Sequence, residues 1–173
     1  KKNFQILKNQ LQQSNAVFNS DTVSVERKIT ADSAERKWNI VLISVESLSG
    51  DYLKYFGGKN NITPYMDSLI PHSLFFSNFY ATGTRTVRGL EALSLAIPPT
   101  PGQSIVRRPN NEDMFTMGNL LKTKGYEVRY VYGGNSFFDN MGYFFSHNGY
   151  KVLDQRDIPE KIVHHKTAWG VAD

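Results

Sequence analysis

The sequence predicts an α/β fold in which helices pack on a central, largely parallel sheet. The first observation is an almost wholly apolar, β-branched run at residues 40–45, which is typical of a strand buried on both faces. The second is that helical spacings of apolar residues alternate with further short apolar runs along the rest of the chain. Alternation of this kind is the pattern of a layered fold in which helices connect parallel strands.

Further elements follow this first strand, and residues with fixed backbone preferences mark several of their ends. In chain order we expect a helix at residues 63–69, a strand at 74–80, a helix at 86–96, a helix around 115–121, a strand at 126–132, a helix at 137–147 and a strand at 150–153. Pro64 suits the first turn of a helix, because it needs no N–H partner there. The proline-rich stretch 98–102 ends the helix before it, and Gly125 is typical of the residue that follows a helix.

The composition places the chain among folded globular proteins and excludes several kinds of site. Of its 173 residues, 40% are hydrophobic and 13% are aromatic, which is enough for one domain with a core. The formal charge of +4 comes from dispersed basic residues, so nucleic-acid binding is not expected. The absence of cysteine excludes disulfides, zinc–thiolate sites and a cysteine nucleophile. No apolar run reaches the length of about 18 residues that a membrane-spanning helix needs.

The amino-acid composition changes from polar to apolar at about residue 38. Residues 1–37 are polar, and Phe4, Leu7 and Leu11 have the spacing of one short amphipathic helix. This segment is either a linker or a peripheral helix of the domain, and the sequence alone leaves both open. Residues 38–173 form the domain itself. Both ends of the chain look like cuts, so we expect this domain to be the N-terminal part of a longer one.

The first candidate site residue, Glu46, follows the strand predicted at residues 40–45. In parallel sheets, ligands bind beyond the carboxyl ends of the strands, so a carboxylate at this point is well placed to hold a cation. The alternative is a turn residue without a ligand, which is the commoner role of a single carboxylate after a strand.

The second candidate is the start of the helix predicted at residues 86–96. Thr86 opens this helix, with Arg85 and Arg88 on either side of it. Free N–H groups and the helix dipole attract anions, and arginines add charge-assisted hydrogen bonds, so this segment suits a phosphate or sulfate group. Thr86 is placed to attack such a group, provided that a cation stabilises its alkoxide. The alternative is that Thr86 only caps the helix.

The third candidate lies around the two glycines at residues 133–134, where the backbone can approach a ligand closely. Tyr132 precedes these glycines, and Asn135 and Asn140 follow them. All three side chains are candidates for substrate binding. The alternative is an ordinary glycine turn, with an Asn or Ser that caps the next helix.

Taken in order, these segments resemble one family. They are NIVLISVESL at residues 39–48, TPYMDSL at 63–69, GTRTVRGLE at 83–91, and GY at 125–126 followed by YGG at 132–134. The ordered combination resembles the lipoteichoic acid synthase-like phosphoglycerol transferases of the alkaline phosphatase superfamily. The resemblance covers about residues 39–173 and implies an alkaline phosphatase-like sandwich, with residues 38–173 as the N-terminal part of a sulfatase-like catalytic domain.

The resemblance also implies the roles of particular residues. Glu46 and Thr86 match the positions that bind one divalent cation, Mn²⁺ first, with Mg²⁺ or Zn²⁺ as alternatives. Thr86 matches the threonine that becomes covalently loaded with phosphoglycerol. The family's two other metal ligands, an Asp-His pair, have no counterpart here, so we expect this chain alone to hold the cation weakly. Tyr132 stands where lipoteichoic acid synthases have a histidine, which leaves the substrate open.

The implied activity is transfer of glycerol-phosphate from a lipid head group, such as that of phosphatidylglycerol, to a glycan or growing polymer. It implies a bacterial cell membrane location, with the catalytic domain on the extracytoplasmic side and the anchor in segments outside this chain. Residues 1–37 would be the tether. One alternative is a phosphodiesterase, phosphatase or sulfatase-like hydrolase of the same superfamily, although the sulfatase nucleophile is made from Cys or Ser and Thr86 is neither. The other is a catalytically inactive domain.

Overall fold

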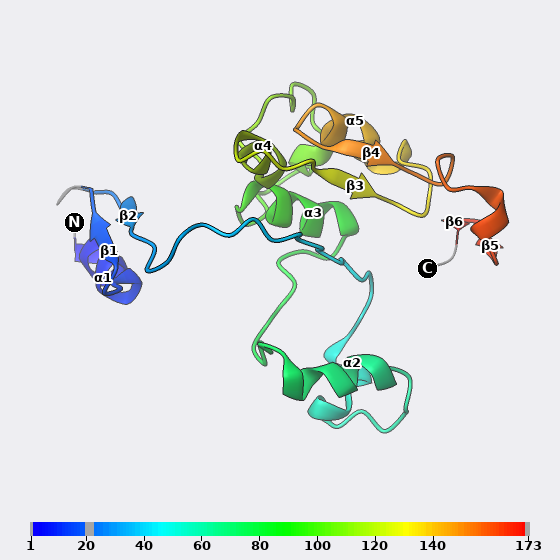
Figure 1. Ribbon diagram of the computed structural model, residues 1–173, viewed down its shortest axis with the longest axis horizontal. Helices are drawn as coiled ribbons and strands as arrows, with labels where there is room; N and C mark the ends of the chain where they lie inside the picture. The colour runs from blue at the N-terminus through cyan, green and yellow to red at the C-terminus, as the bar shows by residue number, and fades with distance from the viewer. Residues whose placement is uncertain (1, 20–22, 172–173) are drawn as a thin grey trace. The chain divides into compact units, whose positions relative to one another are not determined.

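The computed structural model describes residues 2–19 and 23–171 (Figure 1). Contacts within the chain divide it into two compact units, Lys1–Val45 and Glu46–Asp173. The division that the sequence predicts at residue 38 remains a prediction. The candidate site residues all belong to the second unit.

The first unit consists of one helix and one hairpin. Helix α1 (Lys2–Leu11) carries the predicted amphipathic spacing, and strand β1 (Ala16–Phe18) pairs antiparallel with β2 (Arg27–Ile29). The Lys8 ammonium group lies 5.4 Å from the centre of the Phe18 ring, a cation–π distance. A ten-residue helix is marginal alone, so this contact with the hairpin helps to hold it.

Two predicted strands, at residues 40–45 and 74–80, are not formed. Both segments lack ladder hydrogen bonds, and apart from the half-buried Phe75 their apolar side chains are exposed, with Val41 at 82% and Phe79 at 79%. A strand needs a neighbour to satisfy its backbone N–H and C=O groups. No strand in the described part of the chain pairs with either segment. The predictions of these two strands are therefore wrong for this structure, although their composition is that of strands.

The second unit begins with short helices. They are the 3₁₀ turns η1 (Gly50–Tyr52) and η2 (Lys54–Phe56), helix α2 (Pro64–Leu69) and the turn η3 (Ile70–His72). Pro64 occupies the first turn of α2, as predicted. The Asp67 carboxylate accepts the Lys54 N–H at 2.9 Å and the Thr63 hydroxyl at 3.1 Å, which joins α2 to η2.

The rest of the second unit is a helix–strand arrangement around one parallel pair (Figure 1). In order it contains α3 (Thr86–Leu95), η4 (Ile105–Arg107), α4 (Met117–Thr123), β3 (Arg129–Val131), η5 (Phe138–Asn140), α5 (Met141–Ser146) and β4 (Lys151–Leu153). β3 and β4 pair in parallel, with Tyr130 opposite Val152, and η5 and α5 form the connection between them. The predicted helix–strand alternation is confirmed for this part of the chain.

The core lies between α3, η4, α5 and β3. Its buried hydrophobic residues are Val87, Leu90, Leu95, Val106, Met141, Phe144 and Phe145. The Phe145 ring stacks on Tyr130 with centroids 3.8 Å apart, which fixes α5 on the sheet. Gly125 follows α4 with φ 80°, the left-handed conformation expected of a glycine after a helix.

The last part of the described chain closes over the glycine turn at residues 133–134. Here η6 (Glu160–Ile162) precedes the antiparallel strands β5 (Lys166–Thr167) and β6 (Gly170–Val171). The Val171 N–H donates to the Gly133 carbonyl at 2.8 Å. A Cβ atom on Gly134 would lie 2.6 Å from the Trp169 carbonyl oxygen, so only glycine allows this close approach.

Candidate active site

Thr86 is the first residue of α3, and its hydroxyl is available. The N-cap of the helix is Arg85, which has extended backbone angles and whose carbonyl accepts the N–H groups of Arg88 and Gly89. Thr86 is half-buried, and its hydroxyl makes no hydrogen bond within the described part of the chain. The alternative reading of Thr86 as the helix cap is therefore not what the structure shows.

Arg85 reaches across to the segment after the glycine turn. Its guanidinium lies 3.4 Å from the Asp139 carboxylate, whose second oxygen lies 3.4 Å from the Arg107 guanidinium. The Asp139 side chain is only 9% exposed, whereas those of Arg85 and Arg107 are 59% and 38% exposed. One shielded carboxylate thus holds two solvent-facing guanidinium groups beside the start of α3.

Tyr132 lies in the same electrostatic neighbourhood. Burial raises the pKa of its phenol, and the negative charges of Glu46 and Asp139 raise this pKa further. Glu46 therefore lies close enough for its charge to act on Tyr132. Glu46 and Asp139 thus both act on the Tyr132 phenol, and Asp139 also pairs with Arg85, the residue that precedes Thr86 in the sequence.

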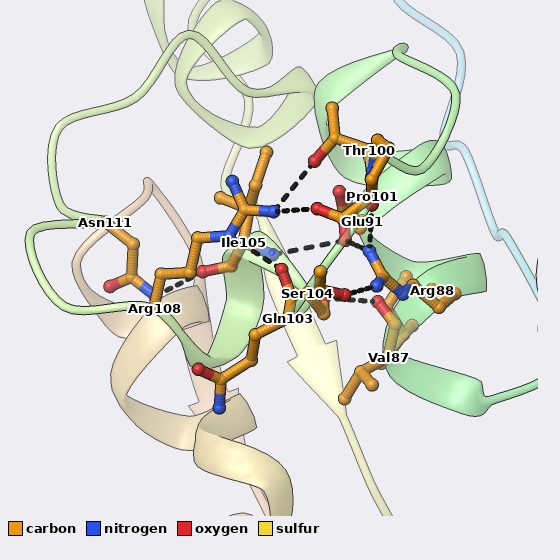
Figure 2. Close-up of polar contacts among 12 residues, drawn as sticks. Val87, Arg88, Glu91, Thr100, Pro101, Gln103, Ser104, Ile105, Arg108 and Asn111 are labelled. Carbon is orange, nitrogen blue, oxygen red and sulfur yellow. Dashed lines mark hydrogen bonds and ion pairs between the residues drawn. The ribbon is translucent and has the colours of Figure 1, made fainter.

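Arg88 has a different environment from Arg85. Figure 2 shows its guanidinium directed at the loop that follows α3. It donates to the Thr100 carbonyl at 2.8 Å and to the Gly102 carbonyl, and it lies 3.4 Å from the Glu91 carboxylate. In this structure Arg88 links α3 to the loop that follows it, and its predicted contact with the substrate stays a prediction.

Glu91 completes this link. Its side chain is fully buried, and one carboxylate oxygen accepts the N–H of Ile105 at 3.1 Å (Figure 2). The Ser104 hydroxyl donates to the Val87 carbonyl at 3.1 Å, so the loop is tied to α3 at a second point. These bonds position η4, and with it Arg107.

The two predicted asparagines have local partners. The Asn135 side-chain oxygen accepts the Phe137 N–H at 3.0 Å, a local turn contact, and among the described residues no side chain caps η5 or α5. The Asn140 amide donates to the Val106 carbonyl at 2.9 Å and so joins η5 to η4. Asn140 also lines an open cavity of about 710 Å³, together with Arg107, Asp139 and Tyr143.

Sequence reasoning missed Asp139, Arg107 and Asp154. Asp154 follows β4 and is 1% exposed, and its carboxylate accepts the Ser136 N–H at 3.1 Å and the Ser136 hydroxyl at 2.7 Å. Arg156 contacts the same carboxylate at 2.8 Å and holds its pKa well below the usual range. The available signal was a carboxylate directly after a short strand, the same signal that singled out Glu46.

The donor set bears on the expected cation. Glu46 and Thr86 offer oxygen atoms, which suit a hard divalent ion such as Mn²⁺ or Mg²⁺. Across residues 2–19 and 23–171, however, no group of three or more His, Cys, Asp or Glu side chains could hold a metal ion. The assignment of Glu46 and Thr86 as ligands of one cation therefore stays a prediction.

Comparison with known proteins decides the family. The sulfatase family model matches residues 38–169. The chain belongs to the sulfatase family. Its structure is similar to a crystal structure of a protein in the alkaline phosphatase superfamily from Vibrio parahaemolyticus, with a TM-score of 0.67 and 35% identity, over 73% of this chain and 31% of that one. The predicted fold class, an alkaline phosphatase-like α/β sandwich present as a fragment, is confirmed.

Relatives of this sulfatase-family chain include phosphoglycerol transferases. It is 28% identical over 168 residues to phosphoglycerol transferase I of Xanthomonas euvesicatoria pv. vesicatoria, and 27% identical over 164 residues to that of Xanthomonas campestris pv. campestris. Each match covers 88% of this chain and 23% of the relative, so the chain spans about a quarter of their length. Among the described residues, no helix has the length and apolar character that crossing a membrane requires.

Proposed function

We propose that the protein containing this chain is a metal-dependent phosphoglycerol transferase in which Thr86 is the nucleophile. The observation that carries the proposal is the Thr86 hydroxyl at the start of α3, which has no hydrogen-bond partner among the described residues and directly follows the exposed Arg85 in sequence. The similarity to phosphoglycerol transferases supports the reaction class. The absence of cysteine and the Thr at the candidate nucleophile position argue against a modified Cys or Ser nucleophile within the same family.

The reaction consists of two displacements at one phosphorus atom. The Thr86 oxygen forms a bond to the phosphorus of a phosphatidylglycerol-like lipid, and the bond from phosphorus to the diacylglycerol oxygen breaks. The Thr86 proton leaves, and the diacylglycerol alkoxide takes up a proton. A hydroxyl of the glycan or polymer then attacks the phosphorus and releases Thr86, which regains its proton. Each half transfers the glycerol-phosphate group without loss of atoms.

The side chains around Thr86 divide the remaining tasks. Arg85 faces solvent beside Thr86 and is suited to neutralise a phosphate oxygen. Tyr132 keeps its proton because burial and the nearby carboxylates raise the pKa, so it can donate a hydrogen bond to the glycerol-phosphate. Glu46 would hold the divalent cation together with Thr86. When bound, Mn²⁺, or alternatively Mg²⁺ or Zn²⁺, supplies positive charge that favours the alkoxide form of Thr86.

The proposed partners and location follow from this substrate. A lipid head group as donor and a glycan or growing polymer as acceptor require the site to work at the surface of the bacterial cell membrane. The proposal places the domain on the extracytoplasmic side, with the membrane anchor in segments outside this chain. Residues 1–37 would then serve as the tether to that anchor.

The first prediction tests the nucleophile. We expect Thr86→Ala in the full-length protein to lower the turnover of phosphatidylglycerol by at least about 1,000-fold, because a residue that forms the covalent intermediate has no substitute. Thr84→Ala is the matched control, since Thr84 is exposed and lies two residues before Thr86. We expect this control to retain wild-type turnover. The measurement is release of labelled diacylglycerol and labelling of the protein by phosphoglycerol.

Two results would contradict parts of the proposal. Unchanged turnover in the Thr86→Ala protein ends the nucleophile assignment. Loss of turnover in Thr86→Ala, but with free glycerol-phosphate as the wild-type product even when a glycan acceptor is present, identifies a phosphodiesterase that uses the same nucleophile and water. Absence of turnover in the wild-type protein with each of the three cations identifies an inactive domain.

A further inference from the structure

We propose that Asp139 is a positioning residue that holds Arg85 and Arg107 together as a two-arginine binding site for the phosphodiester group of the substrate. This inference rests on the proposed function, because it takes the reacting phosphate to lie beside Thr86. It adds two residues, Asp139 and Arg107, to the site and gives Arg85 a defined partner.

The ion pairs supply the geometry. The two carboxylate oxygens of Asp139 each face a different guanidinium, both at 3.4 Å. Arg85 is the residue before α3, and Arg107 ends η4, which is fixed to α3 by Glu91 and Ser104. Arg85 and Asp139, 54 positions apart in the sequence, are thus in contact, and Arg85 directly precedes Thr86.

The charges fit a phosphodiester. Two guanidinium groups and one carboxylate leave a net charge of +1, which complements the single negative charge of a phosphodiester. Each arginine has five N–H donors, and among the described residues the side chains of Arg85 and Arg107 make their polar contacts with Asp139. Both side chains are partly exposed, at 59% and 38%, so further donors are accessible to a ligand. Planar guanidinium groups with free donors are the residues that proteins use to bind phosphate.

Stability alone does not account for this arrangement. Ion pairs of exposed arginines contribute on the order of 0–1 kcal/mol in general. The backbone at this point is left-handed, because Asp139 and Asn140 have φ of 52° and 62°. No other two neighbouring non-glycine residues in the described chain both have a positive φ. Left-handed non-glycine residues of this kind are uncommon and are often found at functional sites.

The second prediction concerns the effect of Asp139→Asn on the affinity for an anionic ligand. A positioning role and simple electrostatics predict opposite changes in this affinity. If the carboxylate only competes with the substrate for the arginines, its removal adds positive charge and tightens anion binding. If it positions both arginines, its removal releases them and weakens binding. We expect about tenfold weaker binding of glycerophosphoglycerol by the full-length protein in calorimetry, and a similar rise in KM for phosphatidylglycerol with a smaller change in kcat.

The controls separate positioning from folding. Asparagine tolerates the left-handed backbone, so the Asp139→Asn protein is expected to fold. Asp113→Asn is the matched control, because Asp113 also has φ 52° but its carboxylate makes no ion pair within the described residues. We expect this control to bind and react as the wild type does. In an Arg85→Ala/Arg107→Ala background, Asp139→Asn is expected to have no further effect on binding.

The outcomes distinguish this inference from the proposed function. Equal or tighter binding by Asp139→Asn, or an equal loss in the double-alanine background, overturns the positioning role even if Thr86→Ala is inactive. Conversely, weaker binding by Asp139→Asn supports the two-arginine site even if Thr86→Ala still turns over, in which case only the nucleophile assignment fails.

Discussion

Asp154 joins the glycine turn to the end of β4 through one buried carboxylate. It accepts both the N–H and the hydroxyl of Ser136, and it pairs with Arg156 through the Arg156 Nε and Nη2 atoms. Ser136 follows the glycine turn and precedes η5, so this carboxylate fixes the start of the segment that carries Asp139. A buried carboxylate with this many donors stabilises the fold only while it is ionised.

The third prediction is a dependence of stability on pH. Arg156 lowers the pKa of Asp154 in the folded protein below the unfolded value of about 3.9. The contribution of the carboxylate is therefore complete above that unfolded value, and it is lost as the pH falls toward the folded pKa. We expect Asp154→Asn to be about 2 kcal/mol less stable than the wild type at pH 7, with a smaller difference below pH ~4.

Urea unfolding of both proteins between neutral pH and pH ~3 measures this difference. Asp113→Asn provides the reference for an exposed carboxylate, and we expect its stability to follow that of the wild type across the range. If the difference in the free energy of unfolding between Asp154→Asn and the wild type stays constant down to pH ~3, the stabilisation does not come from the ionised carboxylate of Asp154.

Among elements, α5 depends on a single buried amide at its C-terminal end. The Asn148 side chain donates to the Phe144 carbonyl at 2.8 Å and to the Asn111 carbonyl at 2.6 Å, and it accepts the Met114 N–H at 2.8 Å. Asn148 is fully buried, so water cannot replace these bonds. This amide closes the last turn of α5 and fastens the loop before α4 to it.

The fourth prediction follows from that burial. We expect Asn148→Ala to lower the free energy of unfolding by about 3 kcal/mol, because the substitution leaves three buried backbone groups without partners. Asn61→Ala is the comparison, since Asn61 is exposed, and we expect a change within about 0.5 kcal/mol. Chemical denaturation followed by tryptophan fluorescence measures both. A loss below 1 kcal/mol for Asn148→Ala would show that the loop rearranges to satisfy these groups.

At the level of elements, the sequence predicted best where the signal was local. Pro64, Gly125 and the proline-rich stretch after α3 act through their own backbone preferences, and the structure follows them. The parallel pair of β3 and β4 was readable because the connecting helix lies between the strands in sequence. Sequence analysis did not identify Asp139 as a site residue, because tertiary packing brings it to its partners and no local spacing encodes a contact with Arg85. The ion pair of Arg88, in contrast, has a local signal in the sequence, because Glu91 lies three residues later on the same helix.

Across the whole molecule, the apolar segments at residues 40–45 and 74–80 are the main departure from the predicted sheet. Their composition is that of buried strands, yet Val41 and Tyr80 are at least four-fifths exposed. Composition specifies the preference for a strand, but pairing requires a second segment at the right place. The described part of the chain offers only β3 and β4 as a parallel pair, and neither segment joins them.

The fifth prediction tests this contrast by hydrogen exchange on the chain of residues 1–173. We expect the amides of residues 40–45 to exchange at the rates of an unstructured peptide, because none of the backbone hydrogen bonds in the described part of the chain protects them. The Tyr132 amide, which donates to the Leu153 carbonyl at 2.9 Å at the end of the β3–β4 pair, is expected to exchange at least about 100-fold more slowly. If residues 40–45 are protected as well as Tyr132, they pair with a strand in solution. In that case the sequence-based strand is right, and a longer sheet brings Glu46 to its carboxyl edge as the residue order predicts.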